Sequence, residues 1–133
     1  MSVSEEQRQL VQQLVTKQYR ALDSENATAW ASYFKEEATF TSPYGEWKGR
    51  AAIQEFMGEH ILSGMESSVR HYISNFYFME EGEDIRASFY IQKVKVNVKE
   101  PFIIATAEGN CLAEKIAPDW MLKCFELKID TVE

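Results

Sequence analysis

The first stretch of apolar residues recurs at helical spacing and predicts a helix that ends near Asp23. Ser4-Glu5-Glu6-Gln7 has the form of a capping box, in which a hydroxyl and an amide serve free backbone N–H groups at the helix start. The stripe that would face the core consists of Leu10, Val11, Leu14, Val15 and Leu22, with Tyr19 beside them. The chain therefore opens with an amphipathic helix.

Two shorter helices are predicted next, with a strand between them. Asn26 can cap the second helix, whose aromatic residues are Trp30, Tyr33 and Phe34. Residues 37–48 read as a strand that Pro43 and Gly45 interrupt. A third helix opens at Gly49-Arg50, and its stripe is Ala52, Ile53, Phe56, Met57, His60 and Ile61.

After Gly64 the apolar period changes from helical to two, which predicts strands. These strands cover residues 67–79, 84–98, 101–116 and 120–131. Because the connections are short, the sheet should be an antiparallel meander. Helices followed by strands favour an α+β domain over residues 1–133, with three helices on the concave face of a curved sheet.

Alternation along residues 67–79 separates the two faces of that strand. Val69, His71, Ile73, Asn75 and Tyr77 share one face. If this face meets the helices, the opposite face presents three rings: Tyr72, Phe76 and Phe78. Such a row predicts a homodimer through the outer face of the sheet, or a cover supplied by a loop or terminus of the same chain.

The strand at 101–116 carries small side chains on one face, and these leave room for a cavity or for a closely packed helix. The residues of this face are Ile103, Ala105, Ala107, Gly109, Cys111 and Ala113. Aromatic residues are abundant, at 17 in all, and several could form a pocket wall or simply core. The candidate ligand-contacting residues are Asn75, Trp30, Phe34, Tyr44, Trp47, Met57, Tyr90 and Cys111.

Charge and composition exclude several functions. The net charge of −7 disfavours nucleic acid and anionic membranes as partners, since both need a basic face. We expect no signal peptide and no membrane span, and the two cysteines predict free thiols in a reducing cytoplasm. Neither a metal site nor a cofactor motif is expected. The aromatic residues that could form a pocket wall make a small apolar ligand the predicted partner.

The chemistry depends on the two histidines. His71 falls at an inward position and could be a hydrogen-bonded core residue. His60 suits the end of its helix, and a role in the pocket is the alternative for it. Asp23 also ends a helix, where a carboxylate opposes the helix dipole unless a donor compensates it. If Asp23 held one ring nitrogen of His71, the other nitrogen could act as a general base. Tyr19, one turn before Asp23, is a candidate phenol donor.

Three groups of residues resemble a known family. They are Tyr19-x-Ala21-Leu22-Asp23, then Gly45-x-x-x-Gly49-Arg50-x-x-Ile53-x-x-Phe56, and Arg70-His71-x-x-x-Asn75. Together with the Asn-capped second helix, they are similar to the SnoaL-like branch of the nuclear transport factor 2-like (cystatin-like) superfamily. The resemblance covers about residues 5 to 79 and continues more loosely to Trp120. It implies a cone-shaped α+β barrel.

The resemblance also implies two different functions. Scytalone dehydratase and hexachlorocyclohexane dehydrochlorinase pair an Asp at the end of the first helix with a His on a strand. By this resemblance His71 would remove a proton from carbon, Asp23 would orient it, and Tyr19 and Asn75 would position polar atoms. The expected enzyme is a cofactor-independent lyase or isomerase. The β subunits of ring-hydroxylating dioxygenases carry similar landmarks without catalysis, so a binding or assembly module is the alternative.

Departures from the family pattern fall in the later strands. Gly109-Asn110-Cys111-Leu112-Ala113 lacks the Tyr and Asp of the family's Gly-x-Tyr-x-Asp. The usual basic residue of the last strand is also not evident in the segment from Trp120 to Phe125. The half of the pocket that selects the substrate is therefore unassigned.

Overall fold

The first helix, α1 (Glu5–Asp23), begins and ends where the apolar pattern predicts. In the computed structural model, which describes residues 2–132, the Ser4 hydroxyl accepts a hydrogen bond from the backbone N–H of Gln7 at 3.1 Å. The Gln7 side chain accepts one from the backbone N–H of Ser4 at 2.8 Å. Both donors are thus satisfied by the capping box.

The second helix is shorter than predicted. Asn26 caps α2 (Ala27–Ala31) by accepting a hydrogen bond from the backbone N–H of Ala29 at 3.0 Å. Phe34, expected on this helix, is instead the first residue of β1 (Phe34–Ser42). The aromatic spacing does not separate a helix from the strand that follows it, because both elements bury rings in the same core.

The segment predicted as one interrupted strand, residues 37–48, is a hairpin. It joins β1 to β2 (Gly45–Lys48) in antiparallel pairing. Gly49 then adopts a φ of 92°, a conformation that glycine adopts without steric cost, and α3 (Arg50–Leu62) follows it.

Four long strands complete the sheet: β3 (Val69–Glu81), β4 (Asp84–Lys95), β5 (Phe102–Ile116) and β6 (Asp119–Ile129). The strand order is β2-β1-β6-β5-β4-β3. All neighbours are antiparallel except β1 and β6, which pair in parallel. The meander from β3 to β6 and the mainly antiparallel sheet are confirmed; the parallel closure onto β1 is the addition.

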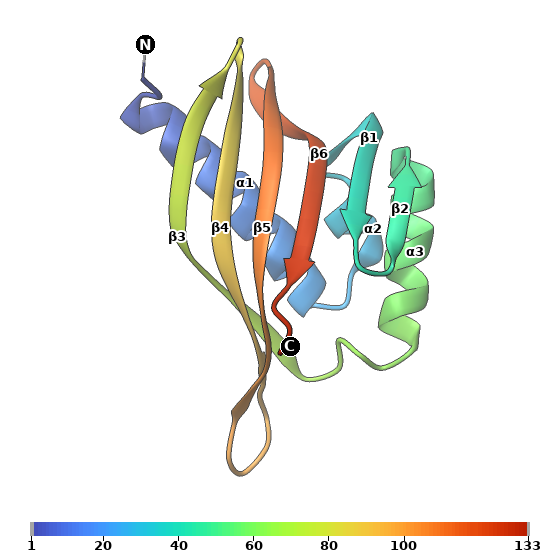
Figure 1. The fold of residues 1–133 in the computed structure, drawn as a ribbon. Helices are drawn as coiled ribbons and strands as arrows, with labels where there is room; N and C mark the ends of the chain where they lie inside the picture. Colours follow the sequence, from blue (N-terminus) through green and yellow to red (C-terminus); the bar gives the residue numbers. More distant parts are fainter. Residues whose placement is uncertain (1, 133) are drawn as a thin grey trace.

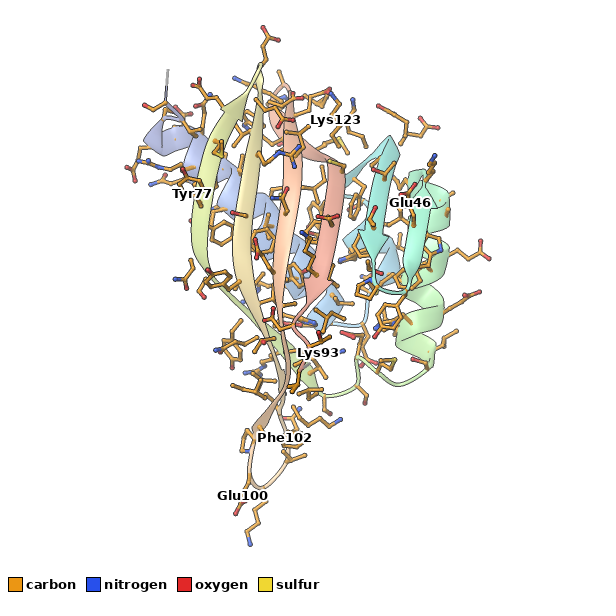
Figure 2. All side chains as sticks on the ribbon, in the orientation of Figure 1. Glu46, Tyr77, Lys93, Glu100, Phe102 and Lys123 are labelled. Carbon is orange, nitrogen blue, oxygen red and sulfur yellow. The ribbon has the colours of Figure 1, made fainter. Side chains whose placement is uncertain are left out.

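The helices lie on one face of the curved sheet, which confirms the α+β architecture (Figure 1). In this view α1 crosses behind the long strands, and α2 and α3 lie beside β1 and β2. The β4–β5 hairpin extends beyond the rest of the sheet, and Figure 2 shows Glu100 and Phe102 on this extension. The opposite face of the sheet carries no helix among residues 2–132.

A bulge in β3 corrects the predicted outer face. The pairing of β3 with β4 shifts between Ser74 and Tyr77, and Asn75 has a φ of 59°. The extra residue reverses the alternation, so Phe76 and Phe78 pack against the core while Tyr77 is exposed. The expected row of Tyr72, Phe76 and Phe78 is therefore wrong beyond Tyr72.

One of the two alternatives for the small side chains of β5, a cavity, applies to part of the strand. Ala105 and Ala107 line a cavity, described below. Further along, the ring of Phe89 lies directly over Gly109, where an added Cβ would overlap it. This end of β5 is closely packed, although by a ring of the neighbouring strand and not by a helix.

Within residues 2–132, no helix combines the length and the apolar character needed to cross a membrane. The longest, α1, has 19 residues and exposes a polar face.

Candidate active site

Asp23 and His71, 48 residues apart in the chain, are in direct contact. The Nδ1 atom of His71 lies 2.7 Å from Oδ1 of Asp23. The backbone N–H of His71 also donates to Oδ1 and Oδ2 of Asp23, at 3.1 and 3.2 Å. Because a carboxylate only accepts hydrogen bonds, this contact places the ring proton on Nδ1 and turns Nε2 away from Asp23.

The fold explains why this pair forms. Asp23 is the last residue of α1, and His71 is the third residue of β3, an edge strand of the sheet. An edge strand has backbone N–H groups without a partner strand, and the Asp23 carboxylate satisfies one of them. The ring of His71 points to the helix side, where its side chain is only 7% exposed.

A buried glutamate faces the other edge of the imidazole. Glu66 is 2% exposed and lies between α3 and β3. Its Oε2 atom accepts hydrogen bonds from Lys93 Nζ at 2.6 Å and lies 3.1 Å from His60 Nε2. Its Oε1 atom lies 3.4 Å from His71 Nε2, without hydrogen-bond geometry to any group in residues 2–132.

The charge of Glu66 is compensated locally. Burial tends to raise the pKa of Glu66, but the hydrogen bonds from His60 and Lys93 outweigh it and hold the pKa below the ordinary value. Lys93 stands directly across from His71 in the pairing of β3 with β4. The carboxylate is thus an acceptor at neutral pH.

Tyr19 completes the polar groups. Its ring centroid lies 5.1 Å from that of His71. Burial is the main reason that the pKa of the Tyr19 phenol is raised far above its ordinary value, and nearby Cys111, Glu66 and Asp23 add to it. Tyr19 is therefore a neutral phenol that can donate a hydrogen bond.

A cavity of about 90 Å³ lies beside these polar groups. His71, Glu66, Lys93 and His60 line it, and Tyr44, which is 52% exposed, places its mouth at the surface. Apart from Ser42, the remaining wall is apolar: Leu22, Trp30, Phe40, Phe56, Met57, Ile91, Ala105, Ala107, Leu127 and Ile129. The space beside His71 is thus open and mostly nonpolar.

The cavity includes part of the predicted set of residues. Tyr19, Trp30, Tyr44, Met57 and His71 line it. Asp23 does not line the cavity, but it contacts the Nδ1 atom of His71, which does.

Three further candidates do not line the cavity: Phe34 and Cys111 are buried, and Trp47 is partly buried. Phe34 packs against Trp30, with ring centroids 5.1 Å apart. Trp47 stacks on Phe56 at 3.8 Å and supports the wall from outside. Cys111 is fully buried in the core, and this burial raises the pKa of its thiol to about 12.

Two candidates lie away from the cavity. Tyr90 is on the outer face of the sheet, 56% exposed. Asn75 is exposed at the β3 bulge and does not line this cavity.

Sequence reasoning missed Glu66 and Lys93. Lys93 had a usable signal, because it continues the inward positions Phe89 and Ile91 along β4, where a lysine is unusual. Glu66 lies in a turn outside any regular period, so no spacing argument could find it. No group of three or more His, Cys, Asp or Glu side chains in residues 2–132 is arranged to hold a metal ion.

Solved structures share this fold at low sequence identity. A protein of unknown function with a cystatin-like fold from Nostoc punctiforme has a TM-score of 0.85 at 18% identity, covering 98% of this chain and 96% of its own. A nuclear transport factor 2-like protein from Novosphingobium aromaticivorans has a TM-score of 0.83 at 15% identity, over 96% and 84%. A protein from Catenulispora acidiphila in complex with S-DNPA has a TM-score of 0.83 at 20% identity, over 96% of both chains.

The sequence comparisons identify a family and no characterised relative. No curated protein matches the sequence. The sequence model of the SnoaL-like domain family matches residues 4–113, which include α1, α3, the His71 strand and most of β5. By this match, the chain belongs to the SnoaL-like domain family.

Proposed function

We propose that the protein is a cofactor-independent lyase or isomerase that removes a proton from carbon in a small, mainly apolar substrate. The observation that carries this proposal is the 2.7 Å contact between His71 Nδ1 and Asp23, with the rest of the ring lining an apolar cavity. A histidine held in one tautomer, with its second nitrogen in an enclosed site, has the arrangement of a general base.

In the proposed reaction, His71 Nε2 takes the proton and the electron pair of the broken C–H bond stays on the substrate. The imidazolium that forms is stabilised by Asp23 on its Nδ1 side. In an isomerase His71 returns the proton to another carbon, and in a lyase a leaving group departs with an electron pair. The apolar wall strengthens these interactions because it excludes water.

Tyr19 would act on the substrate's oxygen. As a neutral phenol beside His71, it can donate a hydrogen bond to a carbonyl whose negative charge grows as the proton leaves. This role supports substrates in which the acidic carbon neighbours a carbonyl group.

A non-catalytic ligand-binding module is the second candidate. The observation that favours it is Glu66 Oε1, 3.4 Å from His71 Nε2, which crowds the approach of a carbon to that nitrogen. The complex of the Catenulispora acidiphila protein with S-DNPA indicates that this fold accommodates a bound compound.

Solvent deuterium exchange tests the first candidate without knowledge of the natural substrate. Small cyclic ketones, such as cyclohexanone and 2-cyclohexenone, are incubated with the protein in D₂O, and loss of the proton signals next to the carbonyl is followed by NMR. We expect faster exchange than in buffer for at least one ketone. His71→Gln should exchange at the buffer rate, because an amide is not a base at neutral pH.

The matched control is Arg70→Gln, a change to the same residue type on the exposed side of the same strand. It should exchange like the unmodified protein. Both variants must keep the far-ultraviolet circular dichroism of the parent. A folded His71→Gln with undiminished exchange, or no exchange with any ketone, would contradict the enzyme proposal and leave the binding module.

A further inference from the structure

We infer that Oε1 of Glu66 is the acceptor for a ligand hydroxyl, so that the cavity selects a small apolar ring carrying a hydroxyl group at one end. The inference deepens the proposed function and rests on it only in placing the ligand in the same cavity. It would hold equally for a binding module. Glu66 is thereby assigned as a specificity-determining residue.

The two carboxylate oxygens of Glu66 differ in their hydrogen bonds. Oε2 has two partners, Lys93 Nζ at 2.6 Å and His60 Nε2 at 3.1 Å. Oε1 has no hydrogen-bond partner among residues 2–132, although the side chain is 98% buried. A buried acceptor without a donor is costly, and carboxylate oxygens in this state are rare. An incoming donor would remove the cost.

Glu66 lines the cavity together with His71 and Lys93. Beside them, on the neighbouring strands β5 and β6, small and aliphatic side chains continue the wall, Ala105, Ala107 and Ile129 among them. A ligand that matches this cavity has one hydrogen-bond donor and an otherwise apolar body.

The charge of Lys93 favours a ligand hydroxyl over a ligand ammonium group as the donor to Oε1. Lys93 Nζ lies 2.6 Å from Oε2 of the same carboxylate, so a ligand ammonium at Oε1 would stand near a second positive charge. A neutral hydroxyl donates to Oε1 without that repulsion. The compensated charge of Glu66 thus favours an alcohol or a phenol.

A hydroxyl at this place also orients the ligand for His71. Because Oε1 and Nε2 are 3.4 Å apart, a group bound to Oε1 brings its neighbouring ring carbon toward Nε2. The bound hydroxyl would donate a hydrogen bond to Oε1, and this bond would replace the close contact between Oε1 and the imidazole. In this arrangement Glu66 selects the ligand by its hydroxyl group and positions it, and His71 performs any proton transfer.

The cavity of about 90 Å³ is smaller than the roughly 150 Å³ that encloses benzene in an engineered site. Tyr44, which lines the cavity, is 52% exposed, so a bound ring need not be fully enclosed. Phenol and fluorobenzene are therefore suitable probes, since they have nearly the same size and only phenol donates a hydrogen bond.

The experiment measures the dissociation constants of both probes by calorimetry, for the unmodified protein and for Glu66→Gln. We expect the ratio of phenol affinity to fluorobenzene affinity to fall about ten-fold in Glu66→Gln, because a hydrogen bond to a charged acceptor is replaced by a neutral one. The matched control is Glu114→Gln, which alters a glutamate paired with Lys35 at 2.9 Å outside the cavity and should leave the ratio unchanged.

Three results would overturn the inference: an unchanged ratio in Glu66→Gln, tighter binding of benzylamine than of phenol, or no binding of either ring. If Glu66→Gln does not fold, the unmodified protein still provides a test. Two-dimensional NMR should show the His60 and His71 ring signals shifting more with phenol than with fluorobenzene. Because no turnover is measured, failure here leaves the proton-transfer proposal intact, and failure of ketone exchange leaves this inference intact.

Discussion

Replacing Asp23 by Asn tests the contact on which the site depends, because the substitution keeps the shape of the side chain and removes its charge. Asp23 accepts hydrogen bonds from both the ring and the backbone of His71. Its side chain is 20% exposed, so solvent screens these bonds only in part. Asparagine retains one acceptor oxygen for two donors.

Two opposing terms set the size of the effect. Exchanging a charge-assisted hydrogen bond for a neutral one costs about 1–2 kcal/mol. Removing a negative charge from the C-terminal end of α1 returns about 0.3–1 kcal/mol, since the helix dipole disfavours it. The hydrogen bonds prevail, and Asp23→Asn should lower the free energy of unfolding by about 1 kcal/mol.

The assay is urea denaturation followed by tryptophan fluorescence, with Glu25→Gln as the control. Glu25 is exposed two residues beyond Asp23, and its replacement removes the same charge near the same helix end. It should leave stability unchanged or raise it slightly. If Asp23→Asn were as stable as Glu25→Gln, the carboxylate would not hold His71 and the reasoning would be refuted.

Four further predictions concern the rest of the fold. Gly109→Ala should cost about 1–3 kcal/mol in chemical denaturation, because its methyl group meets the buried ring that covers it; unchanged stability would contradict this packing. Gln18→Leu should raise the melting temperature by about 4 °C, because the buried amide of Gln18 has no hydrogen-bond partner within residues 2–132. A lowered melting temperature would contradict this and indicate that the amide has a stabilising partner. The lowered pKa of Glu66 means that its ion pairs stabilise the fold above the ordinary glutamate value of 4.5 and lose that effect as the pH falls through the folded value. The stability gap to Glu66→Gln should therefore shrink in acid, and a gap independent of pH would contradict the assignment. We propose a homodimer through the outer sheet face, so the double variant Tyr77→Arg and Tyr90→Arg should give monomer in light scattering; an unchanged mass refutes it.

Much of the fold could be predicted because it depends on local periodicity. The capping box and the stripe of α1 define that helix within a residue of its observed bounds. The outer face of β3 could not be predicted, since a single residue with positive φ, Asn75, reverses the alternation. A bulge is decided by pairing with the neighbouring strand, and the alternation within one strand does not report it.

The candidate site divides in a similar way. Asp23 and His71 could be identified because each is an unusual choice at its own position, a carboxylate at a helix C-terminus and an imidazole on an apolar face. Glu66 could not, because its burial results from the path of the turn between α3 and β3. Tyr90 was expected in the pocket, but the alternation of side chains along β4 puts it on the outer face of the sheet.

The most direct test of the account is the tautomer of His71, measured by long-range ¹H–¹⁵N NMR of the neutral ring. With only two histidines in the chain, His60→Gln assigns the signals. The account predicts a proton on Nδ1, bound to Asp23, and an unprotonated Nε2 whose signal moves when phenol is added. A proton on Nε2 with a bare Nδ1, or an Nε2 signal that phenol leaves in place, would contradict it.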